Sequence, residues 1–283
     1  MTITIHTLLL AISQALGWTY TLIWSVSLYP QLFHNYRRRA TEGFSLDFAL
    51  LNVLGLCGYT VFNGSLLFSS VIRAQYADRH PQSPEPPVHL NDFFYALHGA
   101  VICGLIYSQF QWPALWNIDR KGAQQMPGRV TMILLGVCFA IVVVDVLGVC
   151  YFPALGAGEW IDVIYLIGNI KLFLTIIKYT PQAWLNYRRQ STRGFCMVAI
   201  LMDFTGGMLS LVQLFIDTAL QNDWSGAAGN APKLVLGNIT ILFDVILMVQ
   251  HYCLYARTSR PETVRPVETD PLLGAEDGRV VRE

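Results

Sequence analysis

The sequence predicts an all-α membrane protein of seven transmembrane helices, arranged as two parallel three-helix repeats joined by a linker helix (3+1+3). Three observations lead to this prediction. Hydrophobic residues make up 53% of the chain and charged residues only 13%, whereas a soluble domain has about 25% charged residues. Seven segments are apolar and long enough to cross a bilayer. Two of these segments end in closely matching polar sequences.

Each predicted span contains roughly 20 mostly apolar residues, which is the length that a bilayer-crossing helix needs. The predicted spans are 13–35, 45–68, 91–111, 130–152, 160–184, 196–217 and 233–255. The first charged residue is Arg37. The apolar N-terminal stretch therefore runs into the first span, and we expect no separate signal peptide.

An internal repeat relates the ends of the first and fifth spans. Residues 29–45 (YPQLFHNYRRRATEGFS) match the region around Pro181 after a shift of 151 positions, sharing Pro, Gln, Asn, Tyr, two Arg, Thr, Gly and Phe. Shared hydrophobicity does not explain a match in polar residues, so we interpret it as a duplication of parallel repeats. The third spans are expected to match as well, with Asp92 and His98 corresponding to Asp244 and His251. The predicted units are 1–111 and 160–255 for the two repeats, 112–159 for the linker helix region, and 256–283 for a disordered cytosolic tail.

The distribution of lysine and arginine predicts the orientation. The segments 36–44, 112–129, 185–195 and 256–283 hold 14 of the 19 basic residues. The opposite-side segments hold only Arg73, Arg79 and Lys233. With seven spans, the N-terminus is expected outside or in a lumen and the C-terminus in the cytosol.

Charged side chains at membrane depth cost about 3 kcal/mol each on insertion scales and indicate functional sites. Asp203 and Asp244 lie in mid-span, with apolar neighbours on both sides. Because burial disfavours a charged carboxylate, both residues are suited to taking up and releasing protons. An ion pair between Asp203 and Lys171 is the structural alternative. Asp47 and Asp92 lie near span ends, where an interfacial role is equally compatible with the sequence.

Lys171 and Lys178 are seven residues apart, so they share one face of the fifth span. Two cations on one face suit a substrate that bears carboxylates. The alternative for Lys178 is that its amine reaches the cytosolic edge of the bilayer.

Pro30 and Pro181 lie near the ends of spans 1 and 5, each followed by a glutamine. A proline inside a helix removes one backbone hydrogen bond and kinks the helix. We therefore expect hinges at these prolines. The carbonyl groups freed beside Gln31 and Gln182 are candidate substrate contacts.

These motifs resemble the PQ-loop family of seven-span transporters, and within it the cystinosin family of proton-coupled lysosomal cystine exporters. The matching segments are YPQLFHNYRR, FSLDFALLN, NDFFYALH, IKLFLTIIKYTPQAWLNY, LMDFTGG and FDVILMVQHYCLY, which cover most of residues 17–255. The resemblance implies alternating-access export of L-cystine with protons from an acidic lysosome or vacuole to the cytosol. It also implies a multi-pass protein of the lysosomal or vacuolar membrane.

The resemblance implies two sets of site residues. The substrate site is expected at Trp24, Gln31, Lys171, Lys178, Tyr179, Gln182, Asn186 and Asp203. The proton-coupling carboxylates are expected at Asp47, Asp92, Asp203 and Asp244, with Asn52 near the proton path.

Three departures from the family pattern are visible. The long N-terminal lumenal domain of the animal proteins is missing, which indicates a short form. Ala199 stands where the family often has an asparagine, four residues before Asp203. In place of a tyrosine-based sorting signal, Glu268, Leu272 and Leu273 form an acidic dileucine pattern that sorting adaptors could bind.

Other classes of function find less support. The six cysteines form no C-x-x-C pair, so no metal site is expected, and no cofactor-binding loop or catalytic constellation indicates an enzyme. A net charge of zero suggests no nucleic-acid partner. Two alternatives stay open: a PQ-loop exporter of cationic amino acids, which Lys171 and Lys178 disfavour, and a seven-span receptor, which does not account for the duplication.

Overall fold

The computed structural model describes residues 2–81, 84–86, 88, 90–119, 125–151, 158–221 and 231–256, and these residues form helices and connecting turns without a β-strand. The first half contains α1 (Thr2–Ser27), α2 (Tyr29–Arg38), α3 (Leu46–Phe68), α4 (Ser70–Arg79), α5 (Leu90–Gln111) and η1 (Pro113–Trp116). The second half contains α7 (Arg129–Tyr151), α8 (Trp160–Ile177), α9 (Tyr179–Arg189), α10 (Met197–Gln221), α12 (Ala231–Val249) and η3 (Gln250–Leu254). The predicted sorting signal lies outside the described residues.

Six helical segments among the described residues are long and apolar enough to cross a membrane. They are Ile5–Arg38, Leu46–Phe68, Asp92–Gln111, Arg129–Tyr151, Trp160–Arg189 and Met197–Ile216. Ile239–Leu254, in the seventh predicted span, is a shorter apolar helix. Many large apolar side chains of these helices are exposed, for example Phe139 on α7 at 72%. Exposure of this kind suits a lipid environment. The prediction of an all-α membrane protein is therefore confirmed.

Two spans are interrupted at matching places. The first breaks at Leu28, between α1 and α2, and the fifth breaks at Lys178, between α8 and α9. Pro30 and Pro181 follow these breaks within the first turn of the next helix. A proline is tolerated in a first turn because the N–H groups there have no partner inside the helix. The prolines thus coincide with helix breaks, as the sequence indicated.

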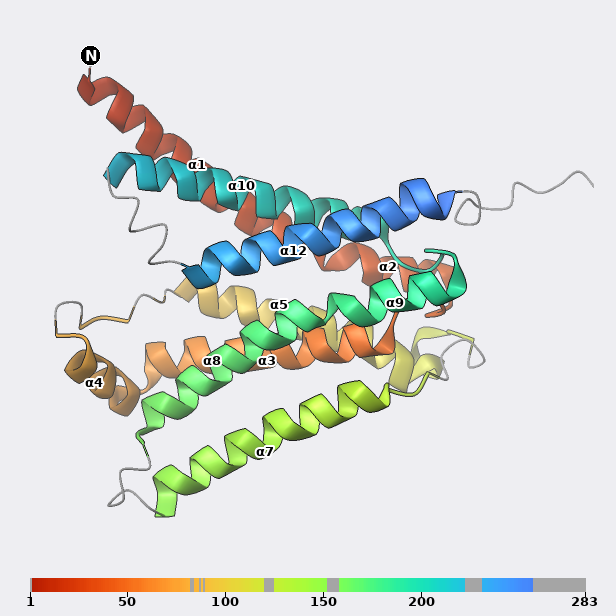
Figure 1. Ribbon diagram of the computed structural model, residues 1–283, viewed down its shortest axis with the longest axis horizontal. Helices are drawn as coiled ribbons and strands as arrows, with labels where there is room; N and C mark the ends of the chain where they lie inside the picture. Colours follow the sequence, from red (N-terminus) through yellow and green to blue (C-terminus); the bar gives the residue numbers. More distant parts are fainter. Residues whose placement is uncertain are drawn as a thin grey trace, which may run out of the picture.

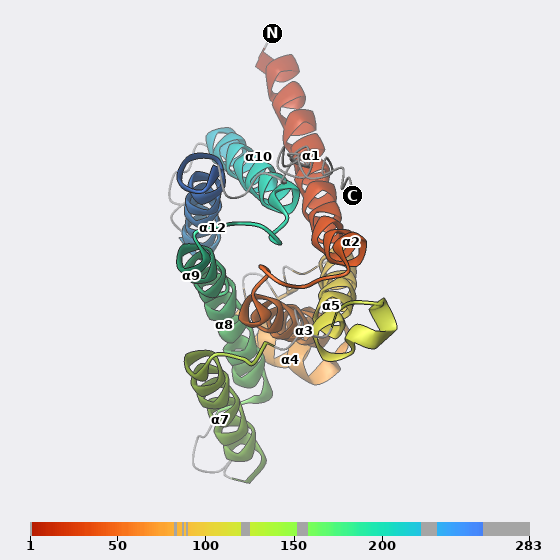
Figure 2. The same ribbon diagram turned by 90° about the vertical axis from the view of Figure 1, so that its right-hand side faces the viewer.

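The helices pack in a pattern that the two halves share. α1 packs along α10, and α3 packs along α8; within each half, α3 contacts α5 and α10 contacts α12. Figure 1 shows these helices running side by side. Viewed from the end (Figure 2), α1, α10, α12, α8, α3 and α5 follow one another around a ring. α7 lies outside this ring beside α8.

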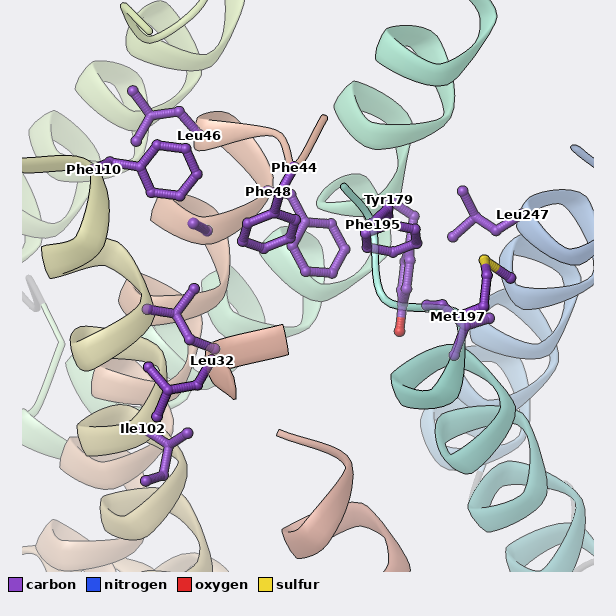
Figure 3. Packing of buried hydrophobic residues seen from close by; sticks show 13 residues of the cluster. Leu32, Phe44, Leu46, Phe48, Ile102, Phe110, Tyr179, Phe195, Met197 and Leu247 are labelled. Atoms are coloured by element: carbon purple, nitrogen blue, oxygen red, sulfur yellow. The ribbon is translucent and has the colours of Figure 1, made fainter. Parts of the chain in front are cut away.

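The main hydrophobic core lies inside the ring, toward the end where α2 and α9 stop (Figure 3). The rings of Phe44 and Phe195 stack with centroids 6.0 Å apart, so the α2–α3 and α9–α10 connections meet across the ring. Tyr179 packs edge-on against Phe48 at 5.6 Å and stacks on Phe243 at 5.5 Å. Aromatic contacts from both halves therefore close this end of the molecule.

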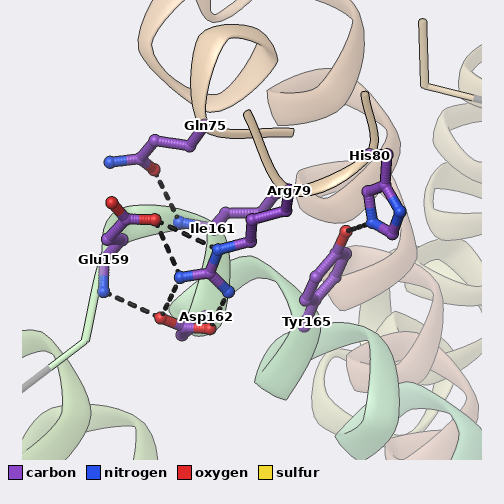
Figure 4. Close-up of polar contacts among 7 residues, drawn as sticks. All are labelled: Gln75, Arg79, His80, Glu159, Ile161, Asp162 and Tyr165. Atoms are coloured by element: carbon purple, nitrogen blue, oxygen red, sulfur yellow. Dashed lines mark hydrogen bonds and ion pairs between the residues drawn. The ribbon is translucent and has the colours of Figure 1, made fainter. Parts of the chain in front are cut away.

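At the opposite end, α4 fastens the first half to the start of α8 (Figure 4). The guanidinium of Arg79 lies between the carboxylates of Glu159 and Asp162, with its Nη2 2.8 Å from Glu159 Oε2. Gln75 accepts a hydrogen bond from the backbone N–H of Ile161 at 3.0 Å. Ion pairs as exposed as these are worth about 0.2–1 kcal/mol each. Their main effect is to set the position of α4.

Candidate functional site

A cavity lies inside the ring, between the two halves. Its volume, as the space open to the centre of a water molecule, is about 70 Å³. Both halves contribute to its wall: Ser27, Leu28, Gln31, Phe44, Phe48, Ala49, Asn52, Cys103, Ile106, Lys178, Phe195, Ala199, Ile200 and Asp203. The wall is mostly apolar and contains one lysine and one aspartate. A mostly apolar pocket with a few polar groups is the usual form of a small-molecule site.

Lys178 lines the cavity and is the residue between α8 and α9. Its Nζ donates a hydrogen bond to Asn52 Oδ1 at 3.1 Å and lies 4.8 Å from the ring centroid of Tyr179. Asn52 in turn donates to Cys103 Sγ at 3.0 Å. Among the ion pairs of the described residues, none includes Lys178. Its charge is therefore available to a substrate carboxylate.

Asp203 also lines the cavity, and neighbours on two sides fix its position. Its Oδ2 accepts a hydrogen bond from the Tyr179 hydroxyl at 2.6 Å. Its backbone carbonyl accepts one from Trp24 Nε1 at 3.3 Å. A Cβ atom at Gly206 would lie 2.6 Å from that indole nitrogen, so only glycine lets α1 approach α10 this closely. The alternative of an ion pair between Asp203 and Lys171 is not found among the ion pairs of the described residues.

The remaining membrane-embedded charges lie outside the cavity wall. Lys171 Nζ sits 4.4 Å from the ring centroid of Tyr59, in a cation–π contact. Asp244 is 1% exposed, and neither of its carboxylate oxygens has a hydrogen-bond partner among the residues that the structure describes. Asp244 interacts electrostatically with Asp203 and Lys178. Asp92 lies in the first turn of α5. A buried carboxyl group without a partner is far more stable in its neutral form than as an anion.

The glutamines of the two Pro-Gln pairs form a reciprocal clasp between the halves. Gln31 Nε2 donates to the Gly194 carbonyl at 3.1 Å, and its Oε1 accepts from the Cys196 N–H at 2.8 Å. Gln182 does the same in the other direction, donating to the Gly43 carbonyl at 3.0 Å and accepting from the Ser45 N–H at 2.7 Å. All four bonds are buried.

A second layer of amides holds each glutamine. Asn35 accepts from Gln31 at 2.7 Å, and Asn186 accepts from Gln182 at 2.9 Å. Asn35 then donates to Gln109 on α5, and Asn186 donates to Gln250 in η3. Gln109 and Gln250 were not predicted, although a glutamine in an apolar span is the kind of signal that could have identified them. Gln109 and Gln250 are 141 positions apart. A residue of α5 therefore corresponds to the residue 141 positions later in α12 or η3.

This register corrects the sequence-based pairing of Asp92 with Asp244 and of His98 with His251. Asp92 lies at the beginning of α5, whereas Asp244 lies well inside α12. His98 contacts the Tyr29 hydroxyl in the first half, and His251 contacts Thr192 in the second. The pairs are therefore not equivalent in position.

Asp47 binds a backbone group rather than lining the cavity. Its Oδ1 accepts a hydrogen bond from the Gly128 N–H at 2.8 Å, just before α7 begins. Gln125 joins the same region, donating to the Phe44 carbonyl at 3.1 Å and accepting from the Leu46 N–H at 3.2 Å. The start of the linker helix is thus docked on the α2–α3 connection of the first half.

The structure therefore divides the predicted substrate residues into groups. Gln31, Lys178 and Asp203 line the cavity. Trp24 and Tyr179 bind Asp203 from outside the cavity wall. Gln182 and Asn186 belong to the clasp, and Lys171 rests on Tyr59. Ala199 lines the cavity with its methyl group.

Comparison with known proteins extends these observations. The PQ loop repeat family matches the chain twice, over residues 12–70 and 163–223. The chain is 36% identical over 253 residues to the Cystinosin homolog of Arabidopsis thaliana, covering 88% of this chain and 89% of the relative. It is 40% identical over 256 residues to Cystinosin of Drosophila melanogaster, covering 89% of this chain. It spans only 60% of that longer protein. The Cystine transporter of Saccharomyces cerevisiae is 26% identical over 256 residues, covering 88% of this chain and 96% of the relative.

Proposed function

Because this chain belongs to the cystinosin family of PQ-loop proteins, we propose that it exports L-cystine together with protons from an acidic lysosome or vacuole to the cytosol. The observation that carries the proposal is the cavity between the two halves, which both Lys178 and Asp203 line. L-Cystine bears two carboxylates and two ammonium groups. A cavity with one fixed cation and one fixed anion complements such a zwitterion.

The proposed architecture has seven spans in a 3+1+3 arrangement. Residues 1–111 and 160–255 are the two parallel repeats, 112–159 contains the linker helix, and 256–283 is the cytosolic tail. The shared packing of α1 on α10 and of α8 on α3 supports two equivalent units. The excess of arginine at the α2/α9 end supports a cytosolic position for that end. The N-terminus is then lumenal, and the membrane is that of the lysosome or vacuole.

In the proposed binding mode, one substrate carboxylate accepts hydrogen bonds from Lys178, and one ammonium group donates to Asp203. Asn52 turns Lys178 toward the cavity, and Tyr179 orients the Asp203 carboxylate. Gln31 offers a further amide at the wall, although its hydrogen bonds to the opposite half are made without substrate. The small side chain of Ala199 leaves room on the Asp203 side.

Proton coupling is proposed to use Asp203, Asp244 and Asp92, the last of which lies in the first turn of α5. Asp244 supports this role because both of its oxygens are buried without partners, so losing its proton there is unfavourable. Protonation in an acidic lumen removes charge from the interior and lowers the barrier to rearrangement. Release of the protons from these carboxyl groups to the cytosol then returns the carrier to its starting state. Two pH units supply about 2.7 kcal/mol per proton.

Alternating access requires that one end of the cavity open when the other closes. The clasp of Gln31 and Gln182 is the proposed cytosolic gate, because each glutamine holds the loop of the opposite repeat. The helix breaks beside Pro30 and Pro181 are the proposed hinges. Four neutral hydrogen bonds at about 1 kcal/mol each can be broken once per cycle.

The test is uptake of radiolabelled L-cystine into vesicles whose external medium stands for the lumen, at acidic and neutral external pH. We expect faster uptake at acidic pH, and we expect Asp203→Asn to remove the pH dependence while the protein still folds. Unlabelled lysine and arginine are the competitors, because the rival exporter of cationic amino acids would be inhibited by them. Equal uptake at both pH values would refute proton coupling.

A further inference from the structure

The two loops of the proposed gate carry opposite charges at one pair of equivalent positions. A shift of 151 relates Arg38 to Arg189, and it relates Glu42 to Arg193. Arg189 makes an ion pair across the repeats, with its Nη2 2.9 Å from Glu42 Oε1. Its Nη1 also donates to the Arg193 carbonyl at 2.8 Å. On this side, the two loops are joined by opposite charges.

On the other side, the backbone geometry is the same but the charges are not complementary. Arg38 Nη1 donates to the Glu42 carbonyl at 3.2 Å, as Arg189 does to that of Arg193. Arg38 Nη1 lies 2.8 Å from the place that a Cβ atom at Gly194 would occupy, so it reaches the opposite loop. Arg193, a second cation, directly precedes Gly194 in that loop. Both arginine side chains belong to exposed residues.

The surroundings leave this pair of cations without a carboxylate of its own. Arg38 interacts electrostatically with Glu42, Arg189 and Arg193. Glu42 is already engaged by Arg189. Among the ion pairs of the described residues, none includes Arg38 or Arg193. Like charges held close together favour binding of an anion between them.

We propose that a phosphate group binds between Arg38 and Arg193 and joins the two gate loops where the second ion pair is missing. Guanidinium groups bind phosphate oxygens through paired, charge-assisted hydrogen bonds, which makes phosphate a better partner than a monovalent halide. Two sources offer this chemistry: the headgroup of a phosphoinositide in the adjoining leaflet, and soluble phosphate compounds. The aromatic side chain of Tyr36, which is 55% exposed on α2, is of the kind found at the membrane surface.

The proposed consequence for transport rests on the function proposed above. An anion bound to both arginines would hold the cytosolic gate closed, as the pair of Arg189 and Glu42 does on the other side. Export would then slow when the anion is bound. Binding itself does not depend on that function and can be measured without transport.

The first experiment measures thermal unfolding of the purified full chain in nanodiscs. Phosphatidylcholine nanodiscs with and without a phosphoinositide form one arm. Inorganic phosphate or inositol hexakisphosphate, compared with chloride at equal ionic strength, forms the other. We expect a higher unfolding temperature in at least one arm, and the arm that responds identifies the source of the phosphate.

Three variants make the test specific. R193Q removes the second cation. It is expected to raise the anion concentration that gives half of the temperature shift about tenfold or more. R193E is expected to abolish the response, because it supplies a carboxylate for Arg38 that mimics the other side. R188E is the matched control: it makes the same change of charge at an exposed arginine of α9 outside the pair and should leave the response intact. An equal loss in R188E and R193E, or no response in the wild type, overturns the proposal.

The transport arm uses proteoliposomes made with the responding anion. We expect the anion to lower the rate of cystine transport in the wild type but not in R193Q. Stabilisation by the anion without cystine transport under any condition would uphold the phosphate site and refute the proposed function. Stabilisation with an unchanged transport rate would uphold the site and refute its effect on the gate.

Discussion

The hydroxyl of Tyr179 donates to the carboxylate of Asp203 across an O–O distance of 2.6 Å, joining α9 to α10 beside the cavity. The ring of Tyr179 is packed between Phe48 and Phe243. This hydrogen bond is therefore held by a rigid ring and aims the carboxylate toward the space where substrate is proposed to bind.

Removing this hydroxyl is expected to impair proton-driven transport without unfolding the protein. A hydrogen bond to a charged group is worth about 1.5–3 kcal/mol, so Tyr179→Phe should lower the rate of acid-driven cystine uptake at least tenfold. Tyr187→Phe is the matched control because Tyr187 is 55% exposed on the same helix. Tyr187→Phe should unfold at nearly the wild-type temperature, and Tyr179→Phe should stay folded but unfold at a somewhat lower temperature because Asp203 loses its donor. Unchanged uptake by Tyr179→Phe would exclude the positioning role.

The two lysines of the fifth span should differ in their effect on substrate binding. Lys178 lines the cavity, whereas Lys171 packs on Tyr59 outside its wall. We expect Lys178→Ala to abolish binding of L-cystine and Lys171→Ala to weaken it by less than tenfold. Binding to purified protein by isothermal titration calorimetry measures both. Similar losses in the two variants would show that Lys171 also contacts the substrate.

A methyl group at either glycine of the gate loops should destabilise the closed clasp. Gly43 and Gly194 have φ values of +91° and +102°. A Cβ atom at Gly43 would lie 1.8 Å from the Arg193 carbonyl oxygen. Strain in φ alone costs about 1–2 kcal/mol, and the clash adds to it. We expect Gly43→Ala to lower the unfolding temperature by several degrees.

The control for the glycine experiment is Gly136→Ala on α7, where a Cβ atom would meet no neighbouring atom within 4 Å. Its unfolding temperature should stay the same or rise slightly, since alanine favours the helix. Equal stability of Gly43→Ala and Gly136→Ala would mean that the loops do not contact each other as described.

Substitutions at Asp47 can separate a docking role from a proton-coupling role. Asp47→Asn keeps an oxygen that can accept from the Gly128 N–H, whereas Asp47→Ala does not. If the residue only docks the linker helix, Asp47→Asn should transport cystine with the wild-type pH dependence, and Asp47→Ala should lose about 1–2 kcal/mol of stability. Vesicle uptake at two pH values measures the first effect, and thermal unfolding measures the second. Loss of the pH dependence in Asp47→Asn would instead assign Asp47 to the proton path.

Much of the fold could be predicted because membrane helices follow directly from apolar length. The two Pro-Gln segments indicated a duplication, and the match to the PQ loop repeat family confirms repeats at two positions. The resemblance to the cystinosin family is confirmed by the relatives described above. Contacts between residues far apart in the sequence were harder to predict. The bond between Asp47 and Gly128 joins residues 81 positions apart, and no local pattern encodes it.

The role of the glutamines shows a second limit. The resemblance implies that Gln31 and Gln182 belong to the substrate site, and this stays a prediction. The structure shows both side chains hydrogen-bonded to the backbone of the opposite half. A polar group buried in an apolar span needs a partner, but the sequence does not say whether a ligand or the protein supplies it. The register of the third helices was mistaken for the same reason, because only packing fixes it.

The shift that relates the halves falls from 151 to 141 between the second and third helices, so the first half has ten additional residues there. α4, with ten residues, lies in that interval. The insertion leaves the two ends held differently: exposed ion pairs hold α4, whereas the other end combines buried neutral amides with one exposed ion pair. Salt screens exposed charges but hardly affects buried amides. Ionic strength in the compartment facing α4 should therefore weaken the α4 contacts without weakening the buried amide clasp.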